Sequence, residues 1–209
     1  MKQKLTPRWC IITLTGLLFA AYSAYNAFII IRDRSALSTQ AIFISVVVAL
    51  MFSVLAAYAL TSGLWSSKKL ILFRIIRRVA FIIALLTIFA LKLRTISAVL
   101  AYIDDPRSDA VLYACSYFMT LAGMLILLVY YIFIRRRFLF FPRASVLLPL
   151  IAAILFFGSF ILEVILYFAY GICLEANLLR TVVIRPVFYL GFIGLSVYYM
   201  FPPQIVDPK

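Results

Sequence analysis

Four ionisable residues lie inside or at the edge of strongly apolar segments of this chain: Lys92, Arg94, Glu163 and Arg185. A charge near the centre of a bilayer costs about 3 kcal/mol or more, so such residues mark ligand, ion or proton sites by default. An arginine could hold an anionic group, and a glutamate could orient that arginine or carry a proton. The chemistry open to this chain therefore centres on these four positions.

Helical spacing predicts which of these cations faces the interior. Arg94 shares a helix face with Thr87 and Ser97, because residues three, four or seven apart lie on one side. Lys92 lies about 200° around the same helix. We therefore expect Arg94 to point inward and Lys92 to extend its ammonium group outward.

Further polar side chains fall at compatible depths in other apolar segments. Glu163 shares a stripe with Tyr167, and its level matches that of Arg94 and Arg185. We predict an outward-facing polar pocket for a small anionic or amphipathic ligand, with Arg94 as anchor and Glu163 as its orienting partner. The predicted ligand-binding residues are Arg94, Glu163, Asn26, Tyr117, Tyr167 and Arg185.

Two structural alternatives stay open at this point. Arg94 and Glu163 could form an ion pair that only pins two spans together. Arg185 could instead lie in the headgroup region and contact lipid phosphates.

The elements that must position these residues follow from composition. The chain has 209 residues, of which 67% are hydrophobic and 13% charged, far from the balance of a soluble domain. We predict an all-α, polytopic membrane helical bundle in which residues 1–209 form a single transmembrane domain. The six apolar segments are about 9–31, 41–65, 79–103, 110–134, 144–174 and 181–201.

One connection and two of the apolar segments depart from the simple pattern of short loops and 20-residue spans. Residues 68–78 are basic with an apolar centre, and they predict a short amphipathic helix on the membrane surface. The segment 144–174 is longer than a bilayer requires and should tilt, bend or project. The last segment, 181–201, is the least regular because Pro186 interrupts it.

The distribution of lysine and arginine predicts the orientation. Thirteen of the 20 lie on the side of the N-terminus, and four lie in the opposite loops: Arg32, Arg34, Arg107 and Arg180. The positive-inside rule then places both termini in the cytoplasm of a multi-pass cell-membrane protein. The net charge of +13 belongs mainly to that inner face. It predicts anionic inner-leaflet lipids as partners and gives no reason to expect nucleic acid.

Most catalytic chemistry has no matching pattern in the sequence. The chain has no histidine, and Cys10, Cys115 and Cys173 are far apart with no CxxC spacing. No phosphate-cradling glycine loop and no nucleophile with an adjacent base is recognisable. We therefore expect no metal, no cofactor and no catalytic residues.

The resulting hypothesis is a non-catalytic multi-pass membrane protein that binds or transports a small ligand. Its size, span number and orientation resemble, in outline, the substrate-binding components of energy-coupling-factor transporters. One alternative is an accessory, immunity or regulatory membrane subunit without a ligand. A second is an enzyme that acts on a lipid-linked phosphate substrate.

Overall fold

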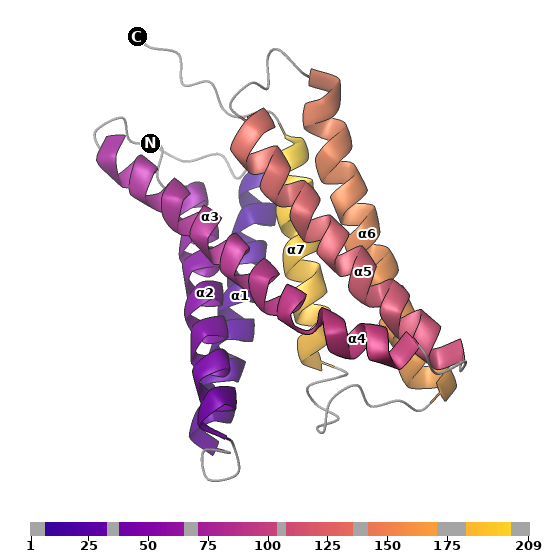
Figure 1. Ribbon diagram of the computed structural model, residues 1–209. Coiled ribbons are helices and arrows are strands. Elements are labelled where there is room, and N and C mark those ends of the chain that lie inside the picture. The colour runs from indigo at the N-terminus through magenta and orange to yellow at the C-terminus, as the bar shows by residue number, and fades with distance from the viewer. Residues whose placement is uncertain are drawn as a thin grey trace.

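The chain folds as a bundle of helices, seen in a computed structural model that describes residues 7–32, 38–64, 71–103, 108–135, 142–170 and 183–201 (Figure 1). The described ranges contain no strand, so the predicted all-α class is confirmed. The helices are α1 (Pro7–Arg32), α2 (Thr39–Leu64), α3 (Ile71–Arg94), α4 (Ile96–Ile103), α5 (Ser108–Val129), the π-helix η1 (Tyr130–Ile134), α6 (Pro142–Tyr170) and α7 (Arg185–Met200).

Five helical stretches in the described ranges are long and apolar enough to cross a membrane. They correspond to α1, α2, the α3–α4 segment, α5 with η1, and α6. The chain is therefore a multi-pass, membrane-embedded protein. The sixth predicted span is shorter than expected, because α7 has 16 residues and a length of about 24 Å.

The helices pack around α7. Two antiparallel pairs, α1 with α2 and α5 with α6, lie on either side of it, and α7 packs against α1 and α6 (Figure 1). Helix α3 runs obliquely from α2 toward α5, and α4 continues along α5. A short helix suits this central place, since neighbouring helices and not lipid cover most of its surface.

Aromatic rings fill the space around α7. Phe192 is fully buried, and its ring centroid lies 5.1 Å from that of Phe156 on α6 and 5.3 Å from that of Phe19 on α1. Phe52 of α2 is also in contact, with centroids 6.3 Å apart. Edge and offset ring contacts of this kind add stability beyond the area that they bury.

Glycines allow α1 and α7 to approach closely. A Cβ atom built on Gly191 would lie 2.6 Å from Cε1 of Phe19, and one built on Gly194 would overlap Thr15. Packing between membrane helices depends on such small residues, because lipid tails are as apolar as the side chains themselves.

The predicted surface helix at 68–78 is wrong for the described part of that segment. From Ile71 onward these residues form the first turns of α3, which continues unbroken to Arg94. No proline or glycine interrupts the sequence there, and arginines at the start of a membrane helix can extend into the headgroup region. Residues 68–70 lie outside the described ranges.

The predicted span 79–103 is divided at Thr95. The Thr95 hydroxyl donates to the backbone oxygen of Lys92, 2.8 Å away, and a turn separates α3 from α4. A threonine hydroxyl competes with the backbone for such carbonyls and so weakens the helix locally. Helix α6 spans 142–170 in place of 144–174, and residues 171–174 lie outside the described ranges.

Replacing Gly191 by leucine should destabilise the bundle, since the new side chain must displace Phe19 from the α1–α7 contact. We expect a loss of about 1–3 kcal/mol, measured as a lower midpoint of thermal unfolding in detergent. Ala90→Leu is the matched control, because Ala90 of α3 is exposed. Equal midpoints for the two variants would contradict the close packing of α7.

Candidate functional site

The main polar site lies where α5, α6 and the first turn of α7 meet. Nη1 of Arg185 lies 2.8 Å from Oε1 of Glu163, and the two side chains are 20% and 11% exposed. The Tyr189 hydroxyl, one turn further along α7, donates to the same oxygen over 2.7 Å. The hydroxyl of Ser116 on α5 also donates to Oε1 of Glu163, over 3.4 Å. The carboxylate also lies near the N-terminus of α7, where the helix dipole favours a negative charge.

Four buried hydroxyls extend from this carboxylate into the bundle. Ser159 of α6 lies 2.8 Å from Ser116 and 2.7 Å from Thr120, both on α5. Ser159 also donates to the Tyr189 hydroxyl over 3.1 Å. Each hydroxyl can donate and accept, so the network joins α5, α6 and α7 without leaving these groups unsatisfied in an apolar surrounding.

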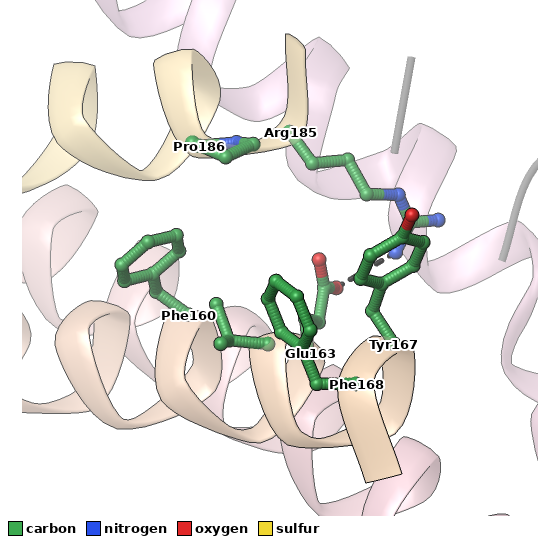
Figure 2. A pocket seen from close by; sticks show the side chains of 7 residues that line it. Phe160, Glu163, Tyr167, Phe168, Arg185 and Pro186 are labelled. Carbon is green, nitrogen blue, oxygen red and sulfur yellow. Dashed lines mark hydrogen bonds and ion pairs between the residues drawn. The ribbon is translucent and has the colours of Figure 1, made fainter. Parts of the chain in front are cut away.

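A cavity of about 130 Å³ lies beside Glu163, between α6 and α7. Most of its walls are apolar, and the lining residues are Phe160, Glu163, Val164, Tyr167, Phe168, Arg185 and Pro186 (Figure 2). Figure 2 shows one carboxylate oxygen of Glu163 joined to Arg185 and the other pointing from α6 toward α7. That second oxygen, Oε2, is buried and has no hydrogen-bond partner among the described residues.

The structure brings three of the predicted site residues together. Glu163, Arg185 and Tyr167 all line the cavity between α6 and α7. The ring of Tyr167 packs edge-on against that of Phe168, with centroids 4.9 Å apart. Arg185, which could also have been placed among lipid headgroups, has Glu163 as its ion-pair partner.

The predicted directions of the Arg94 and Lys92 side chains are wrong. Arg94 is exposed at the end of α3, and the partner predicted for it, Glu163, pairs with Arg185. Lys92 turns inward, with its Nζ 5.6 Å from the ring centroid of Phe188 and 5.8 Å from that of Tyr117. Ser97 is exposed like Arg94, whereas Ile88, one turn before Lys92, is buried, so the two faces were grouped correctly and the polar one was wrongly taken as the inner face.

The remaining two predicted residues make other contacts. The Tyr117 hydroxyl lies 2.8 Å from Oγ1 of Thr95 and donates to the backbone oxygen of Lys92, so it holds the break between α3 and α4. Asn26 is buried, and its Nδ2 donates over 2.8 Å to the backbone oxygen of Tyr22 in its own helix.

Sequence reasoning missed Tyr189 and the apolar walls of the cavity. Tyr189 lies four residues after Arg185, and this spacing was a usable signal that the two share one face of α7. Phe160, Val164 and Phe168 carry no such signal, because apolar side chains on a membrane helix are ordinary wherever they point.

No protein family, curated protein or solved structure matches this chain. The outline resemblance to substrate-binding transporter components stays a prediction, and the site must be interpreted from its own geometry.

Replacing Tyr189 by phenylalanine should weaken the junction of α5, α6 and α7, because one hydroxyl that serves Glu163, Ser159 and Thr120 is lost. We expect a cost of about 1–2 kcal/mol, seen as a lower thermal midpoint in detergent.

Tyr25→Phe is the matched control for that variant. The Tyr25 hydroxyl is buried without a hydrogen-bond partner in the described ranges, so its removal should leave stability unchanged or higher. If Tyr25→Phe lowered the midpoint as much as Tyr189→Phe, the loss could not be attributed to the hydrogen bonds of Tyr189, and the prediction would be wrong.

Proposed function

We propose that this multi-pass membrane protein is a non-catalytic binding component for uptake, which takes a small amphipathic ligand into the cavity between α6 and α7. The single observation that carries the proposal is Oε2 of Glu163, a buried carboxylate oxygen without a partner in the described ranges, beside a cavity. A buried acceptor without a partner costs about 1–3 kcal/mol. A hydroxyl or ammonium group of a ligand would remove that cost.

The two oxygens of Glu163 are suited to different tasks. Oε1 accepts hydrogen bonds from Arg185, Tyr189 and Ser116, and these bonds fix the carboxylate in position. Oε2 has no partner in the described ranges but is itself buried, so a ligand in the cavity would reach it only after a neighbouring side chain moves. A carboxylate held in this way is preorganised, and preorganisation lowers the cost of binding.

The walls of the cavity support an amphipathic ligand over a fully polar one. Phe160, Val164 and Phe168 form an apolar surface beside the single carboxylate. Phe168 is 77% exposed on the outer surface of α6, so the cavity lies next to the lipid-facing side of the bundle. An amphipathic molecule can reach such a site from the membrane and present its hydrogen-bond donor to Glu163.

The anionic ligand expected from the sequence is less well supported by this geometry. That expectation depended on Arg94 as anchor, whereas Arg185 is already paired with Glu163. The proposed ligand therefore needs a donor group at its polar end, and a net negative charge is not required.

Filling the cavity tests the proposal. Val164→Phe places a ring in the cavity without altering the Glu163–Arg185 pair. We expect the wild-type protein to carry a bound small molecule in native mass spectrometry, and both Val164→Phe and Glu163→Gln to lose it.

The matched control is Ile161→Phe, one turn earlier on α6, because Ile161 is 40% exposed outside the cavity. It should keep the bound mass. Retention of that mass by Val164→Phe would contradict the proposal, and purification with a second polypeptide in place of a small molecule would favour the accessory-subunit alternative.

A charge swap separates ligand binding from a structural ion pair. The single variants Glu163→Arg and Arg185→Glu should each lower the thermal midpoint, because each leaves like charges together in an apolar surrounding. We expect the double swap to recover stability but not the bound mass, since the acceptor no longer lies on α6. Recovery of both would mean that the pair only joins the helices.

A further inference from the structure

A second polar region lies at the opposite end of α7, where the charge count predicts the cytoplasmic face. We call it the arginine–tyrosine cluster. Its residues come from α1, α2, α3, η1 with the residue that follows it, and α7: Arg8, Tyr58, Arg77, Tyr131, Arg135, Tyr198 and Tyr199.

Arg135 lies at the centre of this cluster. Its Cζ is 4.3 Å from the ring centroid of Tyr199, 5.5 Å from that of Tyr131 and 5.6 Å from that of Tyr198. An arginine in contact with aromatic rings can still donate its N–H groups to a tetrahedral oxyanion.

Two further arginines contact the same set of rings. Cζ of Arg8 lies 4.8 Å from the centroid of Tyr198, and its Nη2 donates to the Tyr198 hydroxyl over 3.4 Å. Cζ of Arg77 lies 5.3 Å from the centroid of Tyr58, and Tyr58 in turn packs edge-on against Tyr131. Three guanidinium groups therefore gather around one group of tyrosines.

The positive charge of two of these arginines is not balanced by a carboxylate of the described residues. Among the described residues, no carboxylate lies within ion-pair distance of Arg77 or Arg135, and Nε of Arg77 is buried without a hydrogen-bond partner. In the predicted topology five of the seven acids lie on the opposite side of the membrane, Glu163 lies within a span, and Asp207 lies on this side. Like charges held together at low dielectric repel each other unless an anion offsets them.

The backbone is also specialised at this place. Tyr130 and Tyr131 form the first two residues of the π-helix η1, and both are buried. The Tyr130 hydroxyl donates over 3.1 Å to the backbone oxygen of Tyr199 and so fixes α7 against η1. π-helical turns are rare and occur frequently at functional sites.

We infer that the arginine–tyrosine cluster binds a phosphate group. The planar guanidinium group of arginine can donate two parallel hydrogen bonds to two oxygens of a phosphate. Several such groups, with tyrosine hydroxyls nearby, provide the donors that a multiply charged oxyanion requires. The cluster also lies at headgroup depth, since Arg135 directly follows the apolar stretch that ends at Ile134. The phosphate can belong to an anionic lipid or to a soluble phosphate compound, and the experiment distinguishes these sources.

The test measures binding of dioleoyl phosphatidic acid and dioleoyl phosphatidylcholine to the full-length protein in neutral detergent by native mass spectrometry. We expect phosphatidic acid to bind at least about tenfold more tightly, and Arg135→Gln to remove about tenfold of that affinity, the usual effect of losing charged hydrogen bonds.

The matched controls are Arg78→Gln and Arg143→Gln. They remove the same charge from exposed arginines at the same end of the bundle. Both should change the affinity by less than about twofold, since an exposed charge is screened. Equal losses in Arg78→Gln and Arg135→Gln would overturn the inference, because general attraction to a basic surface would then suffice.

Arg135→Lys keeps the charge but removes the planar fork, so it tests geometry if Arg135→Gln folds poorly. We expect it to unfold at a temperature close to that of the wild type and to lose most of the preference for phosphatidic acid. Wild-type preference in Arg135→Lys would also overturn the inference.

Competition with millimolar inorganic phosphate separates the two sources. Displacement of phosphatidic acid supports a site open to soluble phosphate, whereas undiminished lipid binding supports a headgroup site. If neither phosphatidic acid nor inorganic phosphate binds more tightly than phosphatidylcholine, the inference is wrong.

Discussion

The ion pair between Glu163 and Arg185 joins α6 to the first turn of α7 and fixes where that helix enters the bundle. From this point α7 runs between α1 and α6, and its buried rings contact aromatic side chains of α1, α2, α3, η1 and α6. It ends beside the arginine–tyrosine cluster. Both polar regions of the described structure therefore depend on the position of one helix of 16 residues.

The surroundings of that helix follow from the physics of a lipid solvent. Apolar side chains gain little by leaving lipid for one another, so close backbone approach and satisfied polar groups must hold the helices together. Gly191 lets the backbone of α7 lie close to Phe19 of α1. The hydroxyls of Ser116, Ser159 and Tyr189 form hydrogen bonds with one another between α5, α6 and α7. Six buried side-chain atoms have no hydrogen-bond partner in the described ranges, and among them Oε2 of Glu163 belongs to a residue that lines the cavity between α6 and α7.

Much of the fold could be predicted from the sequence, because apolar segments of about 20 residues have few other uses. Glu163 and Arg185 could also be placed at one depth, since position along a span follows from residue number. The direction of each side chain was harder to predict. Arg94 and Lys92 were assigned to the wrong sides because the face with Thr87 and Ser97 was taken as the inner one, whereas Ser97 is exposed and Ile88, on the face of Lys92, is buried.

Other features had no signal in hydropathy. The π-helix at Tyr130–Ile134 arises from one local shift in hydrogen bonding, which a count of apolar residues does not reveal. The partner of Glu163 depends on how α6 and α7 are rotated against each other, and that rotation is set by packing. The sequence therefore predicted the depth of a residue in the membrane better than the direction of its side chain. Depth follows from position along one helix, whereas direction depends on how two helices pack against each other.

The shortness of α7 also has an electrical consequence. Its length of about 24 Å is less than the roughly 30 Å of hydrocarbon in a typical bilayer. The polar regions at its two ends therefore bring charged groups closer together across the membrane than lipid headgroups are. A transmembrane voltage acts with about 2.3 kcal/mol per 100 mV on an elementary charge that crosses the whole membrane. Any movement of α7 along its axis would therefore carry Arg185 through part of that voltage and would depend on it.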